Sequence, residues 1–101
     1  MKKEVKKVPV WLYVELIEAC AAVKNYKSAI EYCNILLDDS PVDIDLLCTK
    51  AMLLYKNHDF NETLKTLKVL RDNDFEKLYA KNAESLYYSA LAFLVMEKEN
   101  Q

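Results

Sequence analysis

Residue types that commonly carry chemistry are scarce in this chain of 101 residues, which has one histidine, His58, three cysteines and no glycine. Nucleophilic catalysis needs a serine or cysteine next to a base, and no serine here has a histidine at a suggestive spacing. Zinc-type sites need clustered cysteines and histidines, and phosphate-binding loops need glycine. We therefore expect no catalytic residues, no metal site and no cofactor, and we predict that the chain is not an enzyme.

Cysteines at three positions, Cys20, Cys33 and Cys48, each lie among apolar residues at helical spacing. An odd number of cysteines does not make a disulfide framework, so we interpret them as small core residues in a reducing, cytoplasmic compartment. No apolar stretch reaches the roughly 20 residues that a membrane-spanning helix requires. The sequence therefore predicts no membrane insertion.

Charge is nearly balanced, with a net value of −2, so the whole chain has no electrostatic preference for nucleic acid. The one local bias is residues 1–7, which contain four lysines. We assign residues 1–9 to a basic N-terminal tail and favour a solvated tail over a phosphate-binding one. Nucleic-acid contact, if made, is expected only through this tail, and an RNA-associated subunit is the alternative function.

Helices are expected throughout, because glycine is absent and there are only two prolines, Pro9 and Pro41. Apolar residues recur with a period of 3.6 and predict helices at 10–24, 26–38, 43–57 and 59–72, followed by a long helix over about 75–97. Asp43 is a predicted N-cap, and Asp59 with Glu62 is a predicted capping box.

An internal repeat emerges when the sequence is shifted by 34 residues against itself, since apolar and small positions then coincide. A third unit follows at an offset of 39, where Leu86, Ala90 and Phe93 match Leu47, Ala51 and Leu54. The pairs matched at offset 34 are Tyr13 with Leu47, Ile17 with Ala51, Cys20 with Leu54, Tyr26 with Phe60, Ala29 with Thr63, Cys33 with Leu67, and Leu36 with Leu70.

The segment from Asn25 to Tyr32, followed by Leu36 and Asp39-Ser40-Pro41, resembles the second helix and closing proline of the tetratricopeptide repeat (TPR). The segment 59–64 resembles the same element one repeat later. The resemblance implies an all-α fold, a right-handed α-solenoid of TPR-like hairpins with about two and a half repeats in five helices. The domain would span 10–98, with repeats at about 10–41 and 44–75 and a half repeat at 76–97.

Two departures from the family lie at the tight turn between paired helices, where Lys24 and His58 replace its usual glycine. A left-handed backbone there would cost about 1 kcal/mol relative to glycine. A weaker resemblance, to the TPR-bearing subunit of the signal recognition particle, rests on residues 47–50 and 57–60 and on the tyrosine-rich third unit.

In this family, peptide ligands usually lie in a groove lined by the first helix of each hairpin. Its carboxylate clamp for chaperone tails is missing, because Val14, Glu18, Thr49, Glu84 and Tyr88 stand at the matching positions. The groove is instead acidic with aromatic walls, so we predict a basic, partly apolar partner protein or peptide; a merely solvated acidic face is the alternative. By repeat register the groove residues are Trp11, Val14, Glu15, Glu18, Asp45, Cys48, Thr49, Met52, Glu84, Tyr87, Tyr88 and Leu91.

From Leu86 to Met96 every residue except Ser89 is apolar, so the last helix is apolar on all sides. Such a helix is normally covered on several sides, and two hairpins can cover only one. We expect either that the chain is part of a longer repeat array or that another chain supplies the missing cover, self-association through this helix included. The sequence thus predicts a protein–protein interaction scaffold within a larger assembly.

Overall fold

The computed structural model of the chain describes residues 8–99, which contain five α-helices and no strand. The helices are α1 (Val10–Ala22), α2 (Tyr26–Asp39), α3 (Ile44–Lys56), α4 (Phe60–Asn73) and α5 (Ala80–Glu99). The predicted all-α class is therefore confirmed. The lysines of the predicted basic tail lie outside the described residues.

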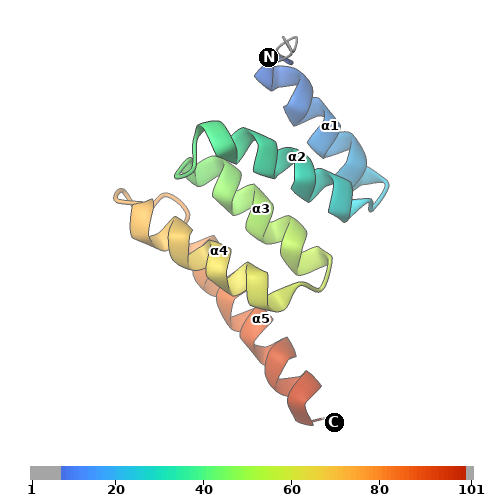
Figure 1. Ribbon diagram of the computed structural model, residues 1–101. Coiled ribbons are helices and arrows are strands. Elements are labelled where there is room, and N and C mark those ends of the chain that lie inside the picture. The colour runs from blue at the N-terminus through green and yellow to red at the C-terminus, as the bar shows by residue number, and fades with distance from the viewer. Residues whose placement is uncertain (1–7, 100–101) are drawn as a thin grey trace, which may run out of the picture.

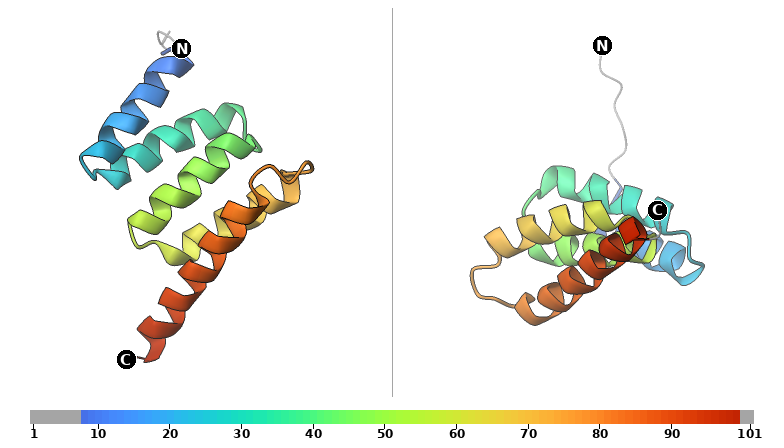
Figure 2. Two further views of the ribbon diagram at one scale, coloured as in Figure 1. Left: turned by 180° about the vertical axis from the view of Figure 1, so that it is seen from behind. Right: turned by 90° about the horizontal axis from the view of Figure 1, so that it is seen from below.

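The helices follow one another in a zigzag, so that each packs mainly against its neighbours in the sequence (Figure 1). The hairpin of α1 and α2 lies at one end, α3 and α4 form the next hairpin, and α5 lies along α4 with a smaller contact to α3. The described chain is elongated, with principal extents of 51 × 33 × 29 Å. Helices α1 and α5 are consequently at opposite ends (Figure 2).

The core is continuous along the stack and consists of two clusters that both contact Leu46 of α3. The first joins α1, α2 and α3 through Ile17, Ala29, Cys33, Leu36 and Leu53. The second joins α2, α3 and α4 through Leu37, Leu47, Cys48, Ala51, Leu67 and Leu70, and Ala83 and Leu86 of α5 pack against it. Helix α3 is thus the central element that holds both ends of the stack together.

The turns inside the two hairpins have the same backbone conformation. Lys24 has φ 62° and His58 has φ 64°, so both occupy the left-handed region, as expected where the family has glycine. In each turn the next amide donates to a carbonyl five residues earlier, Asn25 to Cys20 and Asp59 to Leu54. This hydrogen bond is typical of a Schellman C-cap and satisfies a carbonyl that the helix end leaves free.

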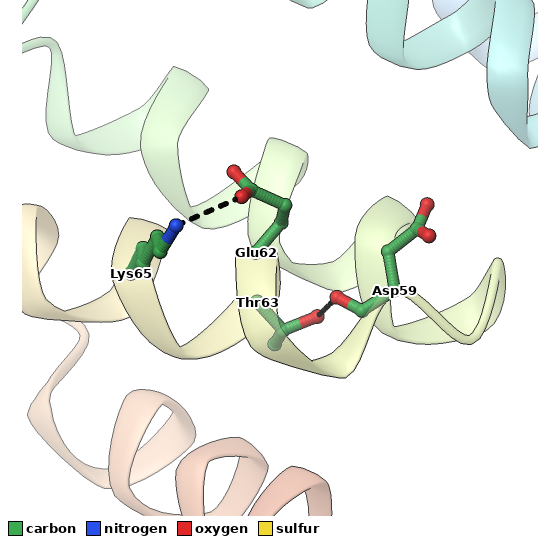
Figure 3. Close-up of polar contacts among 4 residues, drawn as sticks. All are labelled: Asp59, Glu62, Thr63 and Lys65. Atoms are coloured by element: carbon green, nitrogen blue, oxygen red, sulfur yellow. Dashed lines mark hydrogen bonds and ion pairs between the residues drawn. The ribbon is translucent and has the colours of Figure 1, made fainter.

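Asp43 and Asp59 both occupy N-cap positions as predicted, but only Asp43 caps with its side chain, so the predicted capping box is wrong. The Asp43 carboxylate accepts a hydrogen bond from the Leu46 amide at 3.1 Å. Asp59 and Glu62 do not form a capping box: the Asp59 carboxylate accepts from Asn57 Nδ2 at 2.8 Å, and Glu62 pairs with Lys65. Thr63 instead donates its hydroxyl proton to the Asp59 carbonyl at 2.8 Å (Figure 3).

Helix α5 begins at Ala80, so the predicted start near residue 75 is wrong. The reason is the buried Asp74, whose two carboxylate oxygens accept the amides of Leu78 and Tyr79, each at 2.8 Å. Lys77, which lies between Asp74 and Leu78 in the turn, has a left-handed backbone with φ 57°. This carboxylate-centred turn uses amides that a helix would direct to carbonyls, so the helix cannot start until the turn is complete.

Candidate protein-binding surface

A groove of about 690 Å³ lies between α4 and α5 and is named here the α4/α5 groove. Its floor contains the buried Leu67 and Leu70 of α4. Tyr87, Tyr88 and Leu91 line it from α5 and keep exposed surface, 64% in the case of Tyr88. The remaining lining residues are Leu64, Lys65, Lys68, Arg71, Asp74, Lys77, Ala80, Ala83 and Glu84. Hydrophobic and aromatic side chains with polar groups at the edge are typical of grooves that hold an amphipathic helix.

Charge at the edge of the α4/α5 groove is mainly positive, from Lys65, Lys68, Arg71 and Lys77. Lys65 and Lys68 pair with Glu62 at 3.3 Å and Asp72 at 3.7 Å, along the exposed surface of α4. Exposed ion pairs of this kind contribute little to the stability of the fold, so these lysines can also pair with acidic groups of a partner. Arg71 and Lys77 make no ion pair within residues 8–99.

Negative charge in the same groove comes from Asp74 and Glu84. Asp74 is buried and its carboxylate is already occupied by two backbone amides, so Glu84 is the acidic side chain exposed there. The accessible edge of the α4/α5 groove is therefore basic, in contrast to the acidic groove that the sequence predicted.

The four predicted groove residues of α5 do lie together, since Glu84, Tyr87, Tyr88 and Leu91 all line the α4/α5 groove. Their counterpart, however, is α4, a helix that contributed no residue to the prediction. The sequence did contain a signal for it, because Lys65, Lys68 and Arg71 recur every three residues next to Leu64, Leu67 and Leu70. That spacing places a basic edge beside an apolar stripe on one helix.

On α1, the predicted residues Trp11, Val14, Glu15 and Glu18 are all exposed. Trp11 is 65% exposed to solvent and Val14 is 40% exposed. Their spacing of three, four and seven residues places them on a single face of the helix. This face, named here the acidic face of α1, combines two apolar side chains with two carboxylates.

The predicted residues of α3 divide between surface and core. Met52 is exposed and Thr49 is half-buried, but Cys48 keeps only 8% of its surface. Cys48 packs against Leu37, Ala51 and Leu67, so its assignment to a binding groove is wrong. It occupies this place because α3 is the central helix and is covered by neighbours on both sides.

Asp45, the fourth residue of the α3 set, is exposed and accepts a hydrogen bond from the Tyr79 hydroxyl. This hydrogen bond raises the pKa of Tyr79 to about 12, with smaller contributions from burial and nearby charges. It fixes the turn before α5 against the N-terminal end of α3, and it leaves Asp45 already engaged within the chain.

The three cysteines are free thiols, as expected, and two of them are core residues. Burial raises the pKa of Cys33 to about 11, although Lys50 acts in the opposite direction. Burial also raises the pKa of Cys48, with further contributions from Asp45 and Asp74. Neither thiol is prepared to act as a nucleophile, because that role needs a lowered pKa and access.

His58 is an exposed turn residue whose ring centroid lies 5.4 Å from that of Phe60. Phe60 in turn stacks on Phe93 of α5 at 4.9 Å, and Tyr55 contacts both rings edge-on. The aromatic residues near the single histidine thus join α3, α4 and α5. Within the described part of the chain, no three potential metal ligands lie together.

Comparison of the chain with protein-family models, with curated proteins and with solved structures finds no match. Across residues 8–99, no helix is both long enough and apolar enough to cross a bilayer.

Proposed function

We propose that the chain is a protein-binding module that holds a helix or peptide of a partner within a larger assembly. The observation that carries this proposal is the α4/α5 groove, with its leucine floor, its partly exposed Tyr87 and Tyr88 and its basic edge. A single exposed apolar side chain is ordinary on a protein surface, whereas a contiguous apolar surface with a polar edge is typical of binding sites.

The proposed architecture is a TPR-like, right-handed α-solenoid of two and a half repeats. Support comes from four of the pairs matched at offset 34 whose two members are both buried: Ile17 with Ala51, Ala29 with Thr63, Cys33 with Leu67, and Leu36 with Leu70. Further support is the equivalent left-handed turn at Lys24 and His58. Equivalent residues are therefore buried at equivalent places in the two hairpins, as expected of repeats.

The chemistry of the α4/α5 groove favours a partner segment that combines carboxylates with apolar side chains. Lys68, Arg71 and Lys77 would pair with its acids, while Tyr87, Tyr88 and Leu91 would contact its apolar face. The three free thiols agree with a reducing, cytoplasmic setting. This binding role needs no catalytic group.

A second candidate is the basic, partly apolar partner that the sequence predicts, and the exposed acidic face of α1 favours it. Trp11 would provide the apolar anchor, and Glu15 and Glu18 would provide the charges. RNA association through the lysine-rich residues 1–7 is the remaining alternative. It predicts an affinity that falls steeply as salt rises.

Selection of binders from a displayed peptide library tests the two protein-binding candidates. We expect the immobilised chain to enrich acidic, apolar, helix-forming peptides, and we expect Tyr88→Asp with Leu91→Asp to lose them. The matched control is Val42→Asp with Ile35→Asp, because these exposed apolar residues lie outside the α4/α5 groove.

Enrichment of the same peptides on the groove variant would refute the α4/α5 groove as the binding site. Enrichment of basic peptides that are lost on Glu15→Lys with Glu18→Lys would support the second candidate instead.

A further inference from the structure

The acidic face of α1 has the chemistry of the ligand proposed for the α4/α5 groove. Trp11 and Val14 give it apolar contact area, and Glu15 and Glu18 lie one and two turns from Trp11 on the same side. No ion pair within residues 8–99 engages either glutamate. The chain therefore presents an exposed helical surface of two carboxylates and two large apolar side chains.

The α4/α5 groove has the matching chemistry, because Lys68, Arg71 and Lys77 lie at its edge. Tyr87 and Leu91 provide an apolar wall against which a tryptophan can pack. The negative charge of α1 is thus complementary to the positive charge of the α4/α5 groove, and both surfaces expose apolar side chains.

We propose that α1 of a second copy of the chain lies in the α4/α5 groove of the first, with its acidic face toward Lys68 and Arg71. The inference rests on the α4/α5 groove as a binding site and names one occupant of it. A free partner segment of the same chemistry would then compete with this self-association.

The positions of the two surfaces dictate the form of the assembly. Helices α1 and α5 lie at opposite ends of the elongated stack, so one copy cannot fill its own groove (Figures 1 and 2). The contact is therefore head-to-tail, and every bound copy offers a further free groove. Such heterologous contacts produce rings or open chains instead of a closed two-fold dimer.

Sedimentation velocity across concentrations from about 10 µM to about 1 mM, where weak complexes become populated, tests the proposal. We expect the average mass of the wild-type protein to rise with concentration beyond a dimer. We also expect it to fall when salt is raised, because the contact depends on exposed charges.

Two charge-swapped variants provide the decisive comparison. Glu15→Lys with Glu18→Lys makes α1 basic, and Lys68→Glu with Arg71→Glu makes the groove edge acidic. Each variant alone opposes like charges, so its association should weaken at least about tenfold. An equimolar mixture should associate again, because the basic α1 of one variant matches the acidic groove of the other. A merely structural role for these residues would not restore association on mixing.

Asp38→Lys with Asp39→Lys is the matched control for the α1 variant, since it makes the same change in net charge at an exposed end of α2 and should leave association unchanged. Circular dichroism of every variant checks that the helices persist. A wild-type protein that stays monomeric, or a mixture that does not associate, overturns the proposal. So does a two-fold dimer that persists in both charge-swapped variants, as packing of two α5 helices would give.

The same measurements separate this inference from the proposed function. A monomeric wild-type protein whose α4/α5 groove still binds the selected peptides overturns self-association and leaves the binding module intact. Self-association that mixing restores, in a protein that selects no peptide, supports the second copy as the occupant and overturns the separate partner.

Discussion

At the scale of single residues, the three thiols differ in how much solvent reaches them. Cys33 and Cys48 are buried, with pKa values raised by that burial, whereas Cys20 is half-buried. Because the thiolate is the reactive form, we expect a disulfide-exchange reagent at mildly alkaline pH to modify Cys20 first. Cys33 and Cys48 should react only as fast as the chain opens. The reaction can be followed by the colour of the thiol that the reagent releases. Replacing Cys20 with serine should remove the fast phase, and a fast phase that remains would contradict the burial of Cys33 and Cys48.

Tyr79 should titrate at a higher pH than an ordinary tyrosine, because its hydroxyl donates a hydrogen bond to the Asp45 carboxylate, which raises the pKa of Tyr79 to about 12. A folded-state pKa above the ordinary value of 10.0 stabilises the fold fully below pH 10, and the contribution is lost as pH rises through about 12. An ultraviolet absorbance titration of the folded protein should show one late tyrosine. Asp45→Asn should remove it, whereas Asp43→Asn should leave the late transition in place.

Lys24 has a left-handed backbone that glycine adopts without strain. Lys24→Gly should therefore raise the free energy of unfolding by roughly 0.5–1 kcal/mol, measured by urea denaturation. Val23→Gly is the control, because Val23 is exposed at φ −98° and gains nothing from glycine. That variant should lose stability by a similar amount, and equal effects of the two substitutions would show that left-handed strain is absent.

Residue-level prediction from sequence worked where a single local rule decided the outcome. The glycine-like turns at Lys24 and His58 and the Asp43 cap follow from the backbone itself. The Asp59–Glu62 box was wrong because neighbouring groups, Asn57 for Asp59 and Lys65 for Glu62, take the two carboxylates. Which of these hydrogen bonds forms depends on the rotamers of the neighbouring side chains, and the sequence pattern does not specify them.

At the scale of elements, the turn that precedes α5 depends on one buried carboxylate. Asp74→Ala removes two hydrogen bonds to a charged acceptor, and leaves the amides of Leu78 and Tyr79 without partners. We expect a loss of about 2–3 kcal/mol in the free energy of unfolding. Asp72→Ala, which removes an exposed ion pair on α4, should cost less than about 1 kcal/mol. A loss for Asp74→Ala no larger than for Asp72→Ala would contradict this account.

The existence of all five helices could be predicted from periodicity, and four of them begin within about one residue of the structure. The start of α5 could not, because residues 75–79 contain Phe75, Leu78 and Tyr79, which continue an apolar pattern. Asp74 overrides that pattern through its side chain, and nothing in the spacing of apolar residues indicates which aspartate will be buried.

At the scale of the whole molecule, stability should be highest in the middle of the stack. Helix α3 takes part in both core clusters, whereas Val10, Trp11, Val95 and Met96 at the two ends are exposed. Amide hydrogen exchange at low protein concentration should be slowest in α3 and α4. It should be fastest in the first turn of α1 and in α5 beyond Phe93. Equal protection of residues 94–99 and of α3 would show that another surface covers the end of α5.

The α4/α5 groove was only partly predictable for a reason that applies to the molecule as a whole. Repeat register identified Tyr87, Tyr88 and Leu91 as surface groups, and they do line a groove. It did not identify α4 as the opposite wall of that groove, because register compares equivalent helices and does not say which helix lies across a groove. The sign of the charge changed with that neighbour, from the glutamates of α1 to the lysines and arginine of α4.

The dominance of contacts between consecutive helices also bears on how the chain reaches this structure. Each hairpin brings together segments separated by only a short loop, so little chain entropy is lost before packing begins. Proteins built from such short-range contacts form in milliseconds or less. The hairpin of α1 and α2 can therefore assemble before α5 has been synthesised.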